Sequence, residues 1–192
     1  MKNQNVTSYK GFWGMARGFT LIEMLIAVVV LSILLAVAVP SFSGMSEQAK
    51  MQRLAEELQG FFVQSKSEAV LRNQTVYLHF VQVGAPDSGE WGLATRLTST
   101  PVASLSSAQT DALMYLDGQP FKYVTMNFPK ANNSSLLSKL EFEPVNGKPN
   151  QSSSLSFFID NHKRLKLVFS NITGRIRICG KDGAFYGFPP CK

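Results

Sequence analysis

Two arginines spaced two residues apart near the C-terminus are the residues most suited to chemistry in this sequence. In residues 173–180, TGRIRICG, Arg175 and Arg177 alternate with isoleucines. The alternation predicts a β-strand with both arginines on one face, about 7 Å apart. Successive phosphates on an extended strand have a similar separation, roughly twice the 3.4 Å rise of a stacked strand, and a guanidinium suits phosphate oxygens. Alternatively, the arginines form a solvated face whose charges keep a sheet edge from pairing.

The surrounding charge favours an anionic partner. The 192-residue chain has a net charge of +6, and residues 144–192 carry eight Lys and Arg against two Asp. Such an excess suggests a nucleic acid or a lipid surface as partner. The candidate phosphate contacts are Arg175, Arg177, Lys181 and Lys192, with Lys163, Arg164 and Lys166 as second-tier contacts or ordinary surface.

No arrangement typical of an enzyme is present in the sequence. It has no nucleophile–base pattern and no Gly-rich phosphate loop followed by a helix. His79 and His162 are the only histidines, and neither has metal-ligand spacing. We therefore expect no catalytic residues, no cofactor and no metal site.

The N-terminal element that would anchor these residues is strongly apolar. Residues 19–39 contain only Thr20, Glu23 and Ser32 as polar side chains. As a helix they would extend roughly 30 Å, enough to cross a bilayer. A cleaved signal peptide would have a shorter apolar run, although residues 36–38 offer a small-x-small site. A plain membrane anchor would leave Glu23 unexplained, because a carboxylate is costly in hydrocarbon.

The remainder predicts an α+β protein. A helix continuing beyond Pro40 and ending near Asn73 would bury one face, made of Leu54, Leu58, Phe61, Phe62, Ser65 and Ala69. Gly60 in this helix suggests a bend or close packing. About seven short strands follow, at residues 75–83, 90–97, 121–128, 139–143, 154–159, 164–169 and 175–179. Residues 98–111, rich in Ser and Thr, are expected to be an exposed loop. The simplest architecture is a long helix, membrane-spanning in its first half and amphipathic in its second, packed on one or two antiparallel sheets.

The segment RGFTLIEMLIAVVVLSILLAVAVPSF, residues 17–42, resembles the N-terminus of type IV pilins and pseudopilins. The resemblance implies that a prepilin peptidase cleaves between Gly18 and Phe19 and methylates the new amine. It also implies that Glu23 pairs with the amine of a neighbouring subunit and that Pro40 kinks the helix. Such pairing would relieve the cost of a carboxylate in the membrane and so favour assembly. Alternatively, Glu23 reaches the membrane interface unpaired.

A second resemblance covers most of the remaining chain. SKSEAVLRNQTVYL, EWGL, LEFEPVNGKP and LVFSNITGRIRIC look like the FimT/GspH minor pilin family, in that family's order. The family fold implies an N-terminal helix followed by an antiparallel β-sandwich-like domain. The resemblance divides the chain into a leader peptide (1–18), a transmembrane and assembly helix (19–40) and a periplasmic globular domain (41–192). Residues 98–111 and the extended tail follow the family pattern less closely.

The FimT branch is similar in its Gly-Arg-x-Arg motif, here Gly174 to Arg177, and in its basic tail. That similarity implies a minor pilin that binds the DNA backbone without sequence preference during natural transformation. Its other implied partners are major and minor pilins, the prepilin peptidase and the inner membrane. The implied location is a single-pass inner-membrane protein that later enters the pilus at the cell surface. The alternative is a GspH-like pseudopilin of type II secretion, or an architectural minor pilin without DNA affinity.

The two cysteines suggest a disulfide, the default in an exported domain, between Cys179 and Cys191. It would close residues 180–190 into a loop and hold Lys181 beside the two arginines. A thiol-redox role is disfavoured because the spacing is not Cys-x-x-Cys. The loop aromatics, Phe185, Tyr186 and Phe188, either stack on DNA bases or cover the end of the sandwich.

The resemblance generates a test of maturation. Replacing Gly18 with a bulky residue should leave an uncut precursor, because the peptidase must accommodate the residue before the scissile bond. Mass spectrometry of the extracted protein should find Phe19 at the N-terminus of the wild type and residue 1 at that of the variant. A wild-type N-terminus at Val39 would show instead that the apolar run is a discarded signal peptide.

Overall fold

The computed structural model describes residues 18–130 and 136–192, apart from the side chains of residues 37–43. The chain divides into two compact units at the Ser43–Gly44 boundary. A single long helix, α1 (Leu21–Arg72), contributes to both. Its end at Arg72 agrees with the predicted end near Asn73.

The first unit exposes its apolar side chains. Phe19 is 79% exposed, and the large hydrophobic residues from Leu21 to Leu35 are likewise exposed. Among the described residues, no helical stretch is both long and apolar enough to span a bilayer. The predicted span, residues 19–39, includes side chains outside the described part, and it stays a prediction. Pro40 lies within α1, but its side chain and the expected kink are also outside that part, as are leader residues 1–17.

The second unit contains two four-stranded antiparallel sheets. The first sheet has the order β3 (Met114–Asp117), β2 (Trp91–Arg96), β1 (Val76–Gln82), β5 (Lys139–Phe142). The second has the order β4 (Thr125–Asn127), β6 (Ser153–Phe158), β7 (Leu165–Phe169), β8 (Ile176–Gly180). The α+β class with a two-sheet domain is therefore confirmed, with eight strands in the described part of the chain where about seven were predicted.

The differences from prediction lie between β2 and β5. β3 was not predicted, and the strand predicted at residues 121–128 is shorter in the structure, where β4 covers Thr125–Asn127. The first part of that range contributes instead to a short 3-10 helix, η1 (Gln119–Phe121), where Phe121 is buried.

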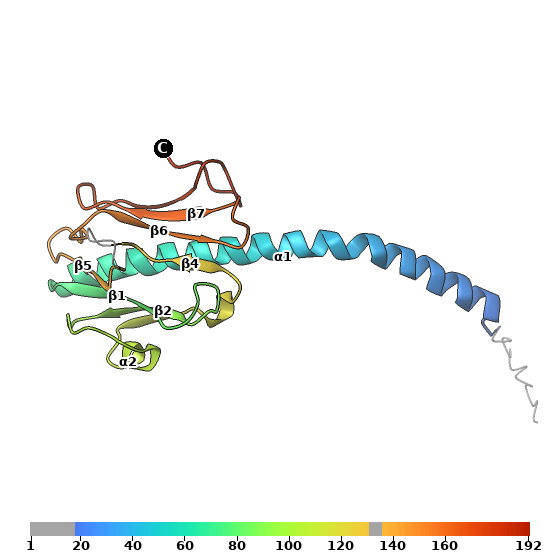
Figure 1. The fold of residues 1–192 in the computed structure, drawn as a ribbon, viewed down its shortest axis with the longest axis horizontal. Coiled ribbons are helices and arrows are strands. Elements are labelled where there is room, and N and C mark those ends of the chain that lie inside the picture. The colour runs from blue at the N-terminus through green and yellow to red at the C-terminus, as the bar shows by residue number, and fades with distance from the viewer. Residues whose placement is uncertain (1–17, 131–135) are drawn as a thin grey trace, which may run out of the picture. The chain divides into compact units, whose positions relative to one another are not determined.

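The core forms where α1 packs against both sheets. Figure 1 shows β6 and β7 on one side of the helix and β1 and β2 on the other. The ring of Phe62 lies 6.2 Å from that of Phe80 in β1 and 5.6 Å from that of Phe169 in β7. The Ser65 hydroxyl shares a 2.7 Å hydrogen bond with the Thr95 hydroxyl of β2. All six residues predicted for the buried helix face are buried, which confirms that prediction.

The Ser- and Thr-rich segment is not a simple exposed loop. It contains a short helix, α2 (Leu105–Gln109), whose first turn is held by a capping box between Ser104 and Ser107. Its buried Ala108 packs with Val81 and Ala94 in a small second core. The prediction was wrong for residues 105–109, because the Ser- and Thr-rich composition outweighed the three- and four-residue spacing of Val102, Leu105, Ala108 and Ala112.

Gly60 also differs from expectation. It is exposed within α1, and a Cβ built on it would have no atom within 4 Å. The structure therefore shows no close packing that requires glycine at this position.

Gly60→Ala should raise the free energy of unfolding by about 0.5–1 kcal/mol, because alanine loses less backbone freedom in a helix. Gly147→Ala is the contrasting variant. Gly147 has φ +59°, and its added Cβ would lie 2.5 Å from Lys66 Cγ, so stability should fall. Urea unfolding of the full chain in a nonionic detergent measures both. An unchanged or lower stability of Gly60→Ala would show that the helix needs glycine there.

Candidate nucleic-acid interface

The two arginines belong to a hairpin made by β7 and β8. Its connection turns at Gly174, whose φ of +63° favours glycine. A Cβ there would lie 3.2 Å from Lys148 Cγ. Lys66 Nζ of α1 donates a 3.2 Å hydrogen bond to the Gly174 carbonyl and so ties the turn to the helix. The predicted hairpin with glycine at the turn is confirmed.

The register of this hairpin decides which side chains face outward. Arg177 pairs with Val168, and Cys179 pairs with Lys166. Since Leu165, Leu167 and Phe169 are buried, the alternate positions of β7 and β8 form the outer face of the second sheet. Arg175 precedes β8 by one residue, is exposed and is two positions from Arg177. Both arginines therefore lie on one face, as predicted.

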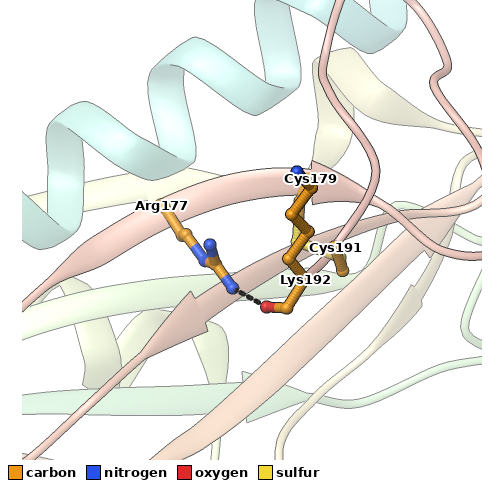
Figure 2. Close-up of a disulfide and its surroundings, with 4 residues drawn as sticks. All are labelled: Arg177, Cys179, Cys191 and Lys192. Carbon is orange, nitrogen blue, oxygen red and sulfur yellow. Dashed lines mark hydrogen bonds between the residues drawn. A yellow bond between two sulfur atoms is a disulfide. The ribbon is translucent and has the colours of Figure 1, made fainter.

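A disulfide lies next to Arg177 on the same strand (Figure 2). Cys179 and Cys191 are joined, with their Cα atoms 4.9 Å apart, which confirms the predicted pair. The Arg177 guanidinium points toward the end of the tail and donates a hydrogen bond from Nη2 to the main-chain oxygen of Lys192. The disulfide thus brings Lys192, rather than Lys181, to the arginine.

A shallow groove runs over this outer face. Lys166, Arg177 and Lys192 line it together with Val168 and with the serines Ser152, Ser154 and Ser170. No Asp or Glu occurs within β4, β6, β7 or β8. The groove therefore offers cationic and hydroxyl donors without a carboxylate in its strands, a combination suited to phosphate.

The other predicted contacts are distributed more widely. Arg164 immediately precedes β7, with its guanidinium 4.6 Å from the centre of the Phe158 ring. Lys181 follows β8 at the same end, where its N–H donates to the Arg164 carbonyl and its Nζ lies 3.9 Å from Asp182. Lys163 lines a separate hollow beside Glu47 and is not brought to the groove.

The tail aromatics cover the core. Phe185, Tyr186 and Phe188 are partly buried and pack against the main hydrophobic cluster. The Tyr186 hydroxyl donates to Glu47 Oε1, and its carbonyl accepts a 3.1 Å hydrogen bond from Gln52 Nε2. Burial raises the pKa of Tyr186, and the hydrogen-bonded carboxylate of Glu47 raises it further. Of the two roles considered for these rings, the structure favours covering the sandwich end.

The N-terminal site residues lie at the start of α1 in the first unit. Gly18 and Phe19 precede the helix and are exposed. The Thr20 hydroxyl accepts a 3.3 Å hydrogen bond from the Glu23 N–H, as an N-cap does. Glu23 is thus in the first turn, where the helix dipole favours a negative charge.

His79, the buried histidine, is explained by local structure. Its Nε2 lies 3.1 Å from the Thr98 carbonyl oxygen, and burial lowers the pKa of its imidazole. Within residues 18–130 and 136–192, no group of three or more His, Cys, Asp or Glu side chains could hold a metal ion.

Sequence reasoning missed the contribution of β6 to this face. Ser154 and Phe158 lie on it with Ser156, because Leu155 and Phe157 point into the core. The alternation SSLSFF carries the signal, because it predicts serines on one face of a strand. The contact of Arg164 with Phe158 has no such local signal.

Comparisons with known proteins agree with this architecture. Residues 13–39 match the prokaryotic N-terminal methylation motif, and residues 54–183 match the family described as type II transport protein GspH. No curated protein sequence matches the chain significantly.

The solved structures of similar fold include the type IV minor pilin FimU of Pseudomonas aeruginosa in two crystal forms. The P21 form has a TM-score of 0.51 at 19% identity and covers 72% of this chain and 97% of that one. The P65 form has a TM-score of 0.49 at 19% identity and covers 68% and 97%. With the GspH model matching more than half of the sequence, the chain belongs to the GspH family and is a pilin-like protein with an N-terminal methylation motif.

Proposed function

We propose that this protein is a minor type IV pilin that binds DNA through the outer face of its second sheet. The observation that carries the proposal is the groove where Lys166, Arg177 and Lys192 converge beside serines, over a sheet whose strands contain no Asp or Glu. Three of the eight Lys and Arg residues of 144–192, namely Lys166, Arg177 and Lys192, line this groove.

The contacts in the groove leave Arg177 able to bind phosphate. A guanidinium has five N–H donors, and the hydrogen bond to Lys192 fixes its orientation while using one nitrogen. Exposed Arg175 stands about 7 Å away along the chain, so the two can hold neighbouring phosphates. Because phosphate contacts carry no base information, such binding is independent of sequence.

The first unit supplies the assembly role in this proposal. Cleavage after Gly18 would place a new amine on Phe19, about one helical turn from Glu23 of the same subunit. The amine of a neighbouring subunit could then pair with Glu23. Residues 19–40 would then cross the inner membrane once, with residues 41–192 in the periplasm, until the subunit enters the pilus. The methylation motif at residues 13–39 supports this maturation.

A pseudopilin role is the second candidate. It is favoured by the name of the matching family, which is that of a type II transport protein. In that case the subunit would be architectural, and the basic face would not bind DNA.

Changing both Arg175 and Arg177 to Gln should weaken binding to all DNA sequences about equally. It should also flatten the slope of log K against log salt by roughly 1.4–1.8, at about 0.7–0.9 per lost phosphate contact. Thermal stability should change by less than about 0.5 kcal/mol, as for other surface substitutions. Titration of labelled oligonucleotides at several salt concentrations, with the full chain in detergent, measures the slope.

The matched control is the pair Arg53→Gln and Arg72→Gln. It removes the same charge from two α1 arginines that pair with Glu57 and Glu68, so the salt slope should stay unchanged. In cells, the Arg175 and Arg177 variant should lose DNA uptake while pili still assemble. Unchanged binding with an unchanged slope would show that the arginines form only a solvated strand face. Loss of pili in the variant would favour the architectural role.

A further inference from the structure

The outer face of the second sheet holds a feature that phosphate binding alone does not explain. Phe158 is the one aromatic side chain among the outward positions of β6, whose neighbours there are Ser154 and Ser156. It is only partly buried, and its ring is covered by the Arg164 guanidinium, 4.6 Å from the ring centre. A phenyl ring at an outward position of a serine-rich face could contact a part of the ligand other than its phosphates.

The guanidinium of Arg164 is held in place from a second direction. Its Nε donates a 3.0 Å hydrogen bond to the Asn161 carbonyl, and its Nη2 donates to the Asn161 side-chain oxygen. The Phe158 ring supports one face of the guanidinium, and Asn161 fixes one of its edges. The guanidinium is therefore a preorganised flat surface. Nucleic-acid bases stack on such planes and on aromatic rings.

The strand register places this stack at the end of a line of cations. Arg177 lies in β8 and Arg175 two residues before it, and Lys166 lies opposite Cys179, the next outward position. Arg164 is two residues before Lys166 and immediately precedes the neighbouring strand, β7. From strand geometry the steps are about 7–8 Å and the line about 20 Å long. The four cations can therefore follow one nucleic-acid backbone, whether single or double.

The stacked pair of Phe158 and Arg164 distinguishes a single-stranded ligand from a double-stranded one. Bases of a duplex are paired and stacked on each other, and so cannot reach the Arg164 plane, whereas an unpaired base next to the backbone can. We infer that the ligand of this face is single-stranded nucleic acid, with phosphates along Arg175, Arg177 and Lys166 and one base stacked on the Phe158–Arg164 pair. This inference rests on the proposed DNA-binding function and adds its substrate class.

The test compares an eight-nucleotide oligothymidine with a duplex of mixed sequence, by fluorescence anisotropy on the full chain in nonionic detergent. Phe158→Leu removes the aromatic support, and Arg164→Lys keeps the charge but removes the plane. Each should weaken oligothymidine binding at least about fivefold, the lower end of what losing one stacked base costs. Duplex binding should change less than twofold.

Tyr77→Leu is the matched control, because Tyr77 carries Lys139 over its ring at 5.0 Å on the other sheet. This variant should leave both affinities unchanged, and thermal unfolding should show that all three variants remain folded. If the wild type binds both ligands and the Phe158 and Arg164 variants lose neither or both equally, the stacking inference is wrong while DNA binding stands. If the wild type binds neither ligand, the proposed function fails with it.

Discussion

Phe62 is completely buried on α1, with Phe80 of the first sheet and Phe169 of the second against its ring. Neither sheet could bury its apolar face alone, since four short strands enclose too little surface. The helix fills the space between them, and the Ser65–Thr95 hydrogen bond pairs the two hydroxyls that this packing buries. The rest of the globular unit is arranged around this contact.

The chemistry of the outer face follows from the same packing. With Leu165, Leu167 and Phe169 committed to the core, Lys166 and Val168 must point outward, and the β7–β8 register then fixes Arg177 outward as well. A slip of one residue would turn Arg177 toward the core in place of the isoleucines of β8. The glycine turn and its tie to Lys66 hold the register at the end where such a slip would begin.

Local patterns in the sequence were sufficient for the features that depend on local periodicity. The buried helix face, the β7–β8 hairpin, the shared face of Arg175 and Arg177 and the cysteine pair could all be predicted. Long-range placement could not. Nothing in the spacing of Cys191 indicates that the tail returns so that Lys192, rather than Lys181, reaches Arg177. The contact of Arg164 with Phe158 likewise depends on the turn between β6 and β7. The position of α2 depends on the packing of Ala108 against the first sheet.

The contacts of Tyr186 affect the order in which the unit can fold. Its hydroxyl and its carbonyl bind Glu47 and Gln52, which are 139 and 134 residues earlier in the chain. Contacts between such distant residues carry a large loop-closure entropy and belong to slowly folding topologies. The surface of α1 around Glu47 and Gln52 therefore stays uncovered until the C-terminal residues have packed against it. A chain delivered progressively from its N-terminus would complete this unit only at the end of delivery.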